Sequence, residues 1–108
     1  MKAKAMVVLE PGRMELTDFD LVPPEKDQIL LKICATSVCA SDPKIFRGVS
    51  GIEKFPVIMG HEIVGRVAEI GEEAAARYGL KGGDRIVVEG KPICGHCEWC
   101  RTEHYYQR

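Results

Sequence analysis

Short runs of apolar and alternating residues predict β-strands along most of the chain. Five such runs, rich in β-branched side chains, cover residues 4–10, 13–19, 28–36, 62–71 and 84–89. Pro11-Gly12 follows the first run and Pro23-Pro24 precedes the third, and such pairs are typical of the turns that separate strands. Short strands with glycine-rich turns predict a mainly β fold, an antiparallel barrel or sandwich.

Two segments predict short helices between the strands. In residues 37–48, Ser41 or Asp42 is suited to cap a single helical turn that opens with Pro43. Residues 72–80 contain helix-forming side chains, enough for about two turns. A glycine ends each predicted helix.

The composition indicates one domain whose partner is a small molecule or another subunit. The chain has 108 residues, which suits a single hydrophobic core. Its net charge is -1 without a basic run, so neither nucleic acid nor an anionic membrane surface is an expected partner. We see no secretion signal and no apolar segment near the roughly 20 residues that span a bilayer, so we expect a cytoplasmic protein.

Three of the five cysteines form a cluster near the end of the chain. Cys94, Cys97 and Cys100, here called the thiol cluster, are spaced so that thiolates from one short loop converge on a tetrahedral zinc ion. The odd number of cysteines and this spacing favour reduced, metal-binding thiols over disulfides. Zinc normally takes a fourth ligand, which the pattern does not supply.

A second candidate site combines the exit of one predicted strand with the start of another. Cys39 lies at a strand exit, where active-site residues gather, whereas Cys34 lies in mid-strand and is interpreted as a small buried hydrophobe. His61 and Glu62 begin a later strand, and adjacent strand residues point to opposite faces. We therefore expect His61 to be the ligand, with Glu62 behind the site or moving in when a ligand leaves.

Two polar residues beside Cys39 complete this hypothesis. If Cys39 and His61 bind one zinc ion, Asp42 is placed to accept the second imidazole N–H and so to fix the tautomer. Ser41 is then the hydroxyl nearest the reacting oxygen, a role compatible with capping the helical turn. The hypothesis requires the sulfur and a ring nitrogen to lie within about 4 Å of each other or to share a metal ion.

Four motifs, in this order and spacing, resemble the N-terminal, GroES-like catalytic domain of the zinc-dependent medium-chain alcohol and polyol dehydrogenases. The motifs are CASD at residues 39–42, GHEIVGRVAEIG at 60–71, GGDRIVV at 82–88 and CGHCEWC at 94–100. The resemblance covers essentially the whole chain. It implies a GroES-like antiparallel β-barrel with short helices and a cysteine-rich zinc-lobe loop. It also implies hydride transfer between an alcohol, polyol or sugar and NAD or NADP.

The resemblance also implies roles for single residues. Cys39 and His61 would hold a catalytic zinc ion, with Glu62 as its neighbour and occasional ligand. Ser41 occupies the position of the proton-relay hydroxyl, and Asp42 lies behind the imidazole. The thiol cluster corresponds to the ligands of a structural zinc ion.

The chain departs from the family pattern at several positions. Lys44 stands where many relatives carry a relay histidine, and Ala40 stands where some carry an arginine against the cofactor. The fourth thiolate of the structural site falls at position 108, which is Arg108, and a guanidinium does not ligate zinc. The fourth ligand is then His104 or a cysteine beyond residue 108, or the thiol cluster holds no metal. His96 is expected to point away from the cluster.

Two features of the complete family are not visible in residues 1–108. No Gly-x-Gly-x-x-Gly motif follows a strand, so the nucleotide-binding Rossmann domain is absent from this chain. The third protein ligand of the catalytic zinc is also expected beyond residue 108. We therefore expect residues 1–108 to be an incomplete catalytic domain, inactive alone, of a homo-oligomeric enzyme. A non-catalytic zinc-binding or assembly module and a zinc-free quinone reductase relative are the alternatives.

Overall fold

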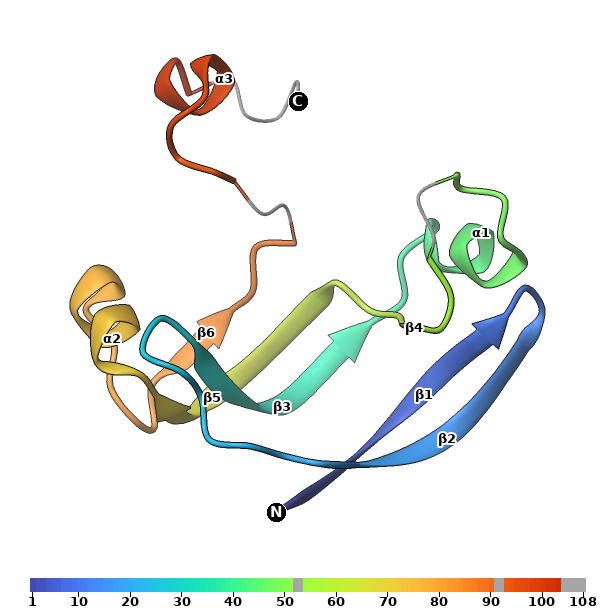
Figure 1. The fold of residues 1–108 in the computed structure, drawn as a ribbon, viewed down its shortest axis with the longest axis horizontal. Helices are drawn as coiled ribbons and strands as arrows, with labels where there is room; N and C mark the ends of the chain where they lie inside the picture. The colour runs from blue at the N-terminus through green and yellow to red at the C-terminus, as the bar shows by residue number, and fades with distance from the viewer. Residues whose placement is uncertain (52–53, 91–92, 104–108) are drawn as a thin grey trace.

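The computed structural model describes residues 1–51, 54–90 and 93–103, and these form a mainly antiparallel β fold, as the sequence predicts. The strands within them are β1 Lys2–Glu10, β2 Arg13–Asp20, β3 Ile29–Ser37, β4 Val57–Ile58, β5 Glu62–Ile70 and β6 Arg85–Val87. They form two three-stranded sheets with the orders β2-β1-β4 and β3-β5-β6 (Figure 1). The five predicted strands are confirmed. Strand β4 was not predicted, because a strand of two residues shows no alternation of apolar and polar side chains.

Both predicted helices are confirmed. Helix α1 spans Asp42–Arg47, and its C-cap Gly48 has a φ of 70°. Helix α2 spans Glu72–Tyr78 and ends at Gly79, which has a φ of 64°. Ser41 occupies the N-cap position of α1, but its side chain makes no capping hydrogen bond, so the hydroxyl is not used by the helix.

The β1–β2 hairpin supports helix α1, from which one of the candidate site residues projects. Val7 and Val8 of β1 are buried, and Val8 is 0% exposed. At the turn of the hairpin the N–H of Gly12 donates to the carbonyl of Phe46 at 2.8 Å. The turn therefore holds α1, which begins with the buried Asp42, against the first sheet (Figure 1).

Strands β3 and β5 pair in an antiparallel sense, so that the end of β3 lies opposite the start of β5. Ser37 pairs with Glu62, and the register shifts by one residue across Cys34, between Ile33 and Ala35. Cys34 is therefore the extra residue of a β-bulge, and it is exposed. The expectation that Cys34 is a buried hydrophobe is wrong, because residues 32–37 of β3 are all exposed and neither face of this part of the strand is covered.

Helix α2 begins against the loop that precedes β3. The N–H groups of Glu73 and Ala74 donate to the carbonyl of Lys26 at 2.9 and 3.0 Å, which satisfies amides that a helix N-terminus leaves unpaired. At the preceding Gly71 a Cβ atom would lie 2.1 Å from the carbonyl oxygen of Glu25. The last glycine of the GHEIVGRVAEIG motif therefore permits a backbone approach that any side chain would block.

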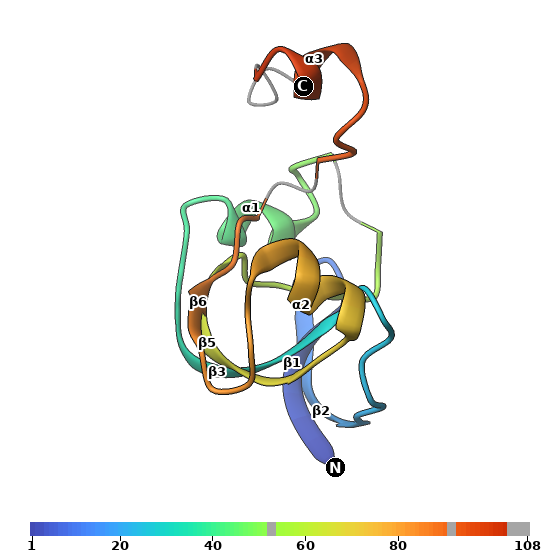
Figure 2. The same cartoon turned by 90° about the vertical axis from the view of Figure 1, so that its left-hand side faces the viewer.

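The segment after β6 carries a short helix, α3, which spans Glu98–Arg101. In both views this segment stands away from the two sheets (Figures 1 and 2). The sequence did not predict α3, because four residues are too few for helical periodicity. Within the described ranges, the helices lack the length and apolar character needed to cross a membrane.

Replacement of Gly71 by alanine should destabilise the protein. The new Cβ would collide with the backbone carbonyls of Glu25 and Lys26, which cannot move without unseating α2. We expect Gly71→Ala to lower the free energy of unfolding by about 1 to 3 kcal/mol, the usual cost of overpacking. Urea denaturation followed by circular dichroism measures this change. Gly82→Ala is the matched control, since a Cβ there meets nothing within 4 Å, and equal losses in both variants would contradict the explanation.

Candidate metal centres

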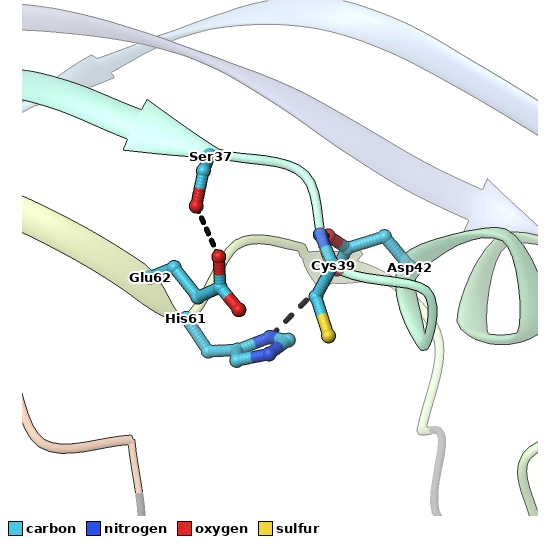
Figure 3. Close-up of polar contacts among 5 residues, drawn as sticks. All are labelled: Ser37, Cys39, Asp42, His61 and Glu62. Carbon is cyan, nitrogen blue, oxygen red and sulfur yellow. Dashed lines mark hydrogen bonds and ion pairs between the residues drawn. The ribbon is translucent and has the colours of Figure 1, made fainter.

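The candidate ligands Cys39, His61 and Glu62 lie together at the junction of β3 and β5. One ligand atom from each residue, namely a sulfur, a ring nitrogen and a carboxylate oxygen, lies within 4.8 Å of the other two. Figure 3 shows the three side chains approaching one another from the exit of β3 and the entry of β5. The sequence predicts this meeting of Cys39 with His61. We call these three residues the β3–β5 site.

Glu62 reaches the site together with His61 because His61 is not part of a strand. Strand β5 begins at Glu62, and Gly60, with a φ of 108°, turns the chain just before His61. Only glycine adopts this φ without strain. The expected placement of the two side chains on opposite faces therefore does not occur, and Glu62 is within reach of the same point as His61.

Asp42 links the β3–β5 site to helix α1. Its Oδ2 accepts a hydrogen bond from the N–H of Cys39 at 2.7 Å, a contact that sequence reasoning missed. Its Oδ1 lies 3.8 Å from Nδ1 of His61, longer than a hydrogen bond, and this buried oxygen has no hydrogen-bond partner among the described residues. The sequence predicts that Asp42 accepts an imidazole N–H, and this hydrogen bond is not formed at 3.8 Å, although the two groups are neighbours.

Hydrogen bonds within the site favour a thiolate at Cys39. The hydroxyl of Ser41, followed by its backbone N–H and then by His61, lowers the pKa of the Cys39 thiol. The pKa of His61 is raised, chiefly by its hydrogen bond with Cys39. Ser41 thus lies beside the sulfur of Cys39. A thiolate, an imidazole and a carboxylate around one point are a donor set that zinc accepts.

A cavity of about 700 Å³ adjoins the site. Its wall is formed by residues of β3, of β5 with the preceding His61, and of the end of β6 and the loop after it: Ala35, Thr36, Ser37, His61, Glu62, Ile63, Val64, Val87, Val88, Glu89 and Gly90. His61 and Glu62 are therefore open to the cavity. A Cβ at Gly90 would lie 3.4 Å from Cβ of His61, so this glycine borders the imidazole closely. Sequence reasoning missed Gly90, because no local pattern relates it to His61.

The thiol cluster forms a second group of possible ligands. Sγ of Cys100 lies 3.8 Å from Sγ of Cys94 and 3.5 Å from Sγ of Cys97. Zinc–sulfur bonds of about 2.3 Å in tetrahedral geometry place two sulfurs about 3.8 Å apart. The spacing of these sulfurs therefore fits one zinc ion, as the sequence predicts.

Hydrogen bonds within the loop distribute charge unevenly over the thiol cluster. The backbone N–H of His96, followed by that of Cys97, lowers the pKa of Cys94 to about 6. The pKa of Cys97 is raised, because hydrogen bonds with the thiols of Cys94 and Cys100, together with burial, outweigh the opposing effect of the Cys100 N–H. Nδ1 of His96 lies 2.9 Å from the carbonyl oxygen of Cys94, so this ring is engaged by the backbone. The proposed fourth-ligand positions 104 and 108 lie outside the described residues.

Comparison with known proteins identifies the family. Residues 25–108 match the alcohol dehydrogenase GroES-like domain, so the chain belongs to this family. It is 37% identical over 103 residues to an S-(hydroxymethyl)glutathione dehydrogenase from Escherichia coli O6:H1, covering 94% of this chain and 27% of that protein.

Solved structures give the same result. An alcohol dehydrogenase from Thermotoga maritima superposes with a TM-score of 0.84 at 34% identity, covering 98% of this chain and 30% of that one. A zinc-dependent alcohol dehydrogenase from Streptococcus pneumonia superposes with a TM-score of 0.78 at 29% identity, covering 92% and 28%. The chain thus spans little more than a quarter of the curated relative described above.

Removal of the Asp42 carboxylate should destabilise the fold. Asp42→Ala leaves the N–H of Cys39 without an acceptor, so we expect the metal-free protein to lose about 1 to 3 kcal/mol of unfolding free energy in urea denaturation. Asp42→Asn keeps an accepting oxygen and should retain most of the stability. Asp84→Ala is the matched control: Asp84 likewise accepts an N–H three residues earlier, from Lys81, but its side chain is 29% exposed against 9% for Asp42. An equal or larger loss in Asp84→Ala would contradict the role given to burial.

The thiol cluster should show a distinct order of reactivity in the metal-free protein. Because the pKa of Cys94 is about 6 and that of Cys97 is raised, Cys94 carries the thiolate at neutral pH and should be alkylated by iodoacetamide before Cys97. Its rate should rise as the pH increases through about 6 and then level off. Mass spectrometry of the labelled peptides measures both rates, and faster labelling of Cys97 at pH 7 would refute the assignment.

Proposed function

We propose that the chain is the front part of the catalytic domain of a zinc-dependent oxidoreductase. The complete enzyme transfers hydride between an alcohol, polyol or sugar and NAD or NADP. One observation carries the proposal: a thiol, an imidazole and a carboxylate converge within 4.8 Å at the edge of a cavity. Catalytic zinc sites combine such protein ligands with a position left open to substrate, and the cavity beside His61 and Glu62 provides that opening.

Each residue of the β3–β5 site has a distinct task in this proposal. Cys39 and His61 would hold the ion, with Glu62 as a third or alternating ligand. An ion held by these residues would supply Lewis-acid polarisation of the substrate oxygen. Ser41, whose hydroxyl lies at the sulfur of Cys39, would take the substrate's hydroxyl proton and pass its own proton on toward solvent. Asp42 would orient the imidazole and the backbone of Cys39.

The thiol cluster would hold a second, structural zinc ion in this proposal. The sulfur spacings of 3.5 and 3.8 Å and the lowered pKa of Cys94 support it, because zinc binds thiolates. Three thiolates leave one position for a further ligand. The alternatives for this position are His104 and a later cysteine, and a third alternative is a cluster without metal.

The remaining parts of the enzyme would lie outside this chain. The chain covers 27% of a dehydrogenase relative, which leaves ample length for a nucleotide-binding domain and a further zinc ligand. We propose that residues 1–108 form an incomplete GroES-like catalytic domain. The complete protein would be a cytoplasmic homo-oligomer that binds a small-molecule substrate and neither nucleic acid nor membrane.

The donor set argues against the two other functions considered. A zinc-free quinone reductase has no need for a thiol, an imidazole and a carboxylate around one point, with Asp42 beside the ring. A non-catalytic zinc-binding module would need only the thiol cluster. The β3–β5 site, open to a cavity, therefore favours the enzyme over both.

Loss of Cys39 should remove both the catalytic ion and the activity. In the complete protein, we expect Cys39→Ala to bind one zinc ion fewer per chain by elemental analysis. Alcohol-dependent reduction of NAD or NADP should fall by more than about a hundredfold, since a Lewis-acid ion supplies several kcal/mol of transition-state stabilisation. Residues 1–108 alone should show no turnover.

The matched variant is Cys97→Ala, which tests the thiol cluster separately. Cys97→Ala should also bind one zinc ion fewer per chain. We expect its main effect to be a lower stability of the protein, with little direct change in the rate of the chemical step. Unchanged zinc content and turnover in Cys39→Ala would refute the proposed catalytic site. Turnover by residues 1–108 alone would refute the proposed division of the enzyme.

A further inference from the structure

Ser37 lies at the end of β3 and contacts the carboxylate of Glu62 directly. The hydroxyl of Ser37 donates a hydrogen bond to Oε2 of Glu62, and the two residues are cross-strand partners in the β3–β5 pairing. Directly opposite residues of an antiparallel pair have Cβ atoms about 4.5 to 5.5 Å apart. A serine hydroxyl therefore reaches the neighbouring carboxylate from a regular backbone.

The register that places Ser37 opposite Glu62 crosses two irregularities. Ala68 of β5 and Cys34 of β3 are each an extra residue, and the second shift offsets the first. Thr36 therefore lies opposite Ile63, and Ser37 lies opposite Glu62. Such bulges are common beside active sites.

The contact leaves one carboxylate oxygen of Glu62 for the β3–β5 site. Figure 3 shows Ser37 on one side of the carboxylate, with Cys39 and His61 on the other. A carboxylate oxygen of Glu62 lies within 4.8 Å of the Cys39 sulfur and of a His61 ring nitrogen. A free glutamate side chain must lose rotamer freedom to stay in such a position, and a hydrogen bond from Ser37 offsets this cost.

We propose that Ser37 is a positioning residue that orients the carboxylate of Glu62 toward an ion held by Cys39 and His61. This inference rests on the proposed function, because it requires a metal ion at the β3–β5 site. Ser37 acts through Glu62 and does not touch the ion itself. Outer partners that orient a ligand change metal affinity by about 10- to 100-fold, so the contribution of Ser37 is measurable.

Cobalt(II) titration of the complete, metal-free protein tests this role. Cobalt occupies zinc sites, and its absorption reports binding to thiolate. The Cys39→Ser variant identifies the part of the absorption that belongs to the β3–β5 site rather than to the thiol cluster. We expect Ser37→Ala to weaken cobalt binding at this site by about tenfold or more. Ser37→Thr, which keeps the hydroxyl, should restore binding close to that of the original protein.

Two further variants separate positioning from other effects. Thr17→Val is the control, since it removes a strand hydroxyl from β2, which belongs to the other sheet, and it should leave cobalt affinity unchanged. In a Glu62→Ala background, Ser37→Ala should cause no additional loss, because the residue through which it acts is gone. Circular dichroism verifies that each variant is folded.

The outcomes distinguish this inference from the proposed function. If Cys39→Ser lowers the cobalt absorption, an ion binds at Cys39. If Ser37→Ala then binds cobalt normally, the positioning role is refuted and the metal site stands. An equal loss from Ser37→Ala with and without Glu62 also refutes it, since Ser37 would then act independently. If Cys39→Ser keeps the full absorption, no ion binds at Cys39, and both proposals are refuted.

Discussion

The antiparallel pairing of β3 with β5 is the constraint on which the candidate site depends. Neighbouring strands lie about 4.7 to 4.9 Å apart, so the exit of one strand and the entry of the other are necessarily adjacent. Cys39 follows the end of β3, and His61 precedes the start of β5. Cys39 and His61 thus meet although they are far apart in the sequence, because each lies next to the end of a strand. Neither residue needs a long, ordered loop to reach the other.

A second layer of contacts holds the loop that carries Cys39. The hairpin turn of the first sheet binds helix α1 through Gly12 and Phe46, and α1 begins with the buried Asp42. Asp42 in turn accepts the N–H of Cys39. A buried carboxylate with an unpaired oxygen is costly, so its presence beside His61 is better explained by the chemistry of the site than by stability alone.

The sequence predicts those features that depend on local pattern or on single residues with special geometry. Alternation identifies β1, β2, β3 and β5, and glycine marks the end of both longer helices. From the sequence, the meeting of Cys39 with His61 is a hypothesis that the resemblance of the surrounding motifs to a known family supports. The bulge at Cys34, the exposure of that cysteine and the contact of Ser37 with Glu62 have no local signal. Register is set by the partner strand, so sequence reasoning could not find these features.

The two groups of metal ligands differ in how they are assembled. The β3–β5 site draws its residues from separate strands, so its geometry exists only when the sheet is formed. The thiol cluster comes from one short segment that stands away from both sheets (Figure 2). Its thiols share protons unevenly, as the opposite pKa shifts of Cys94 and Cys97 indicate, and a metal ion must displace those protons. The sheet therefore places the residues of the β3–β5 site, whereas a single short segment places those of the thiol cluster.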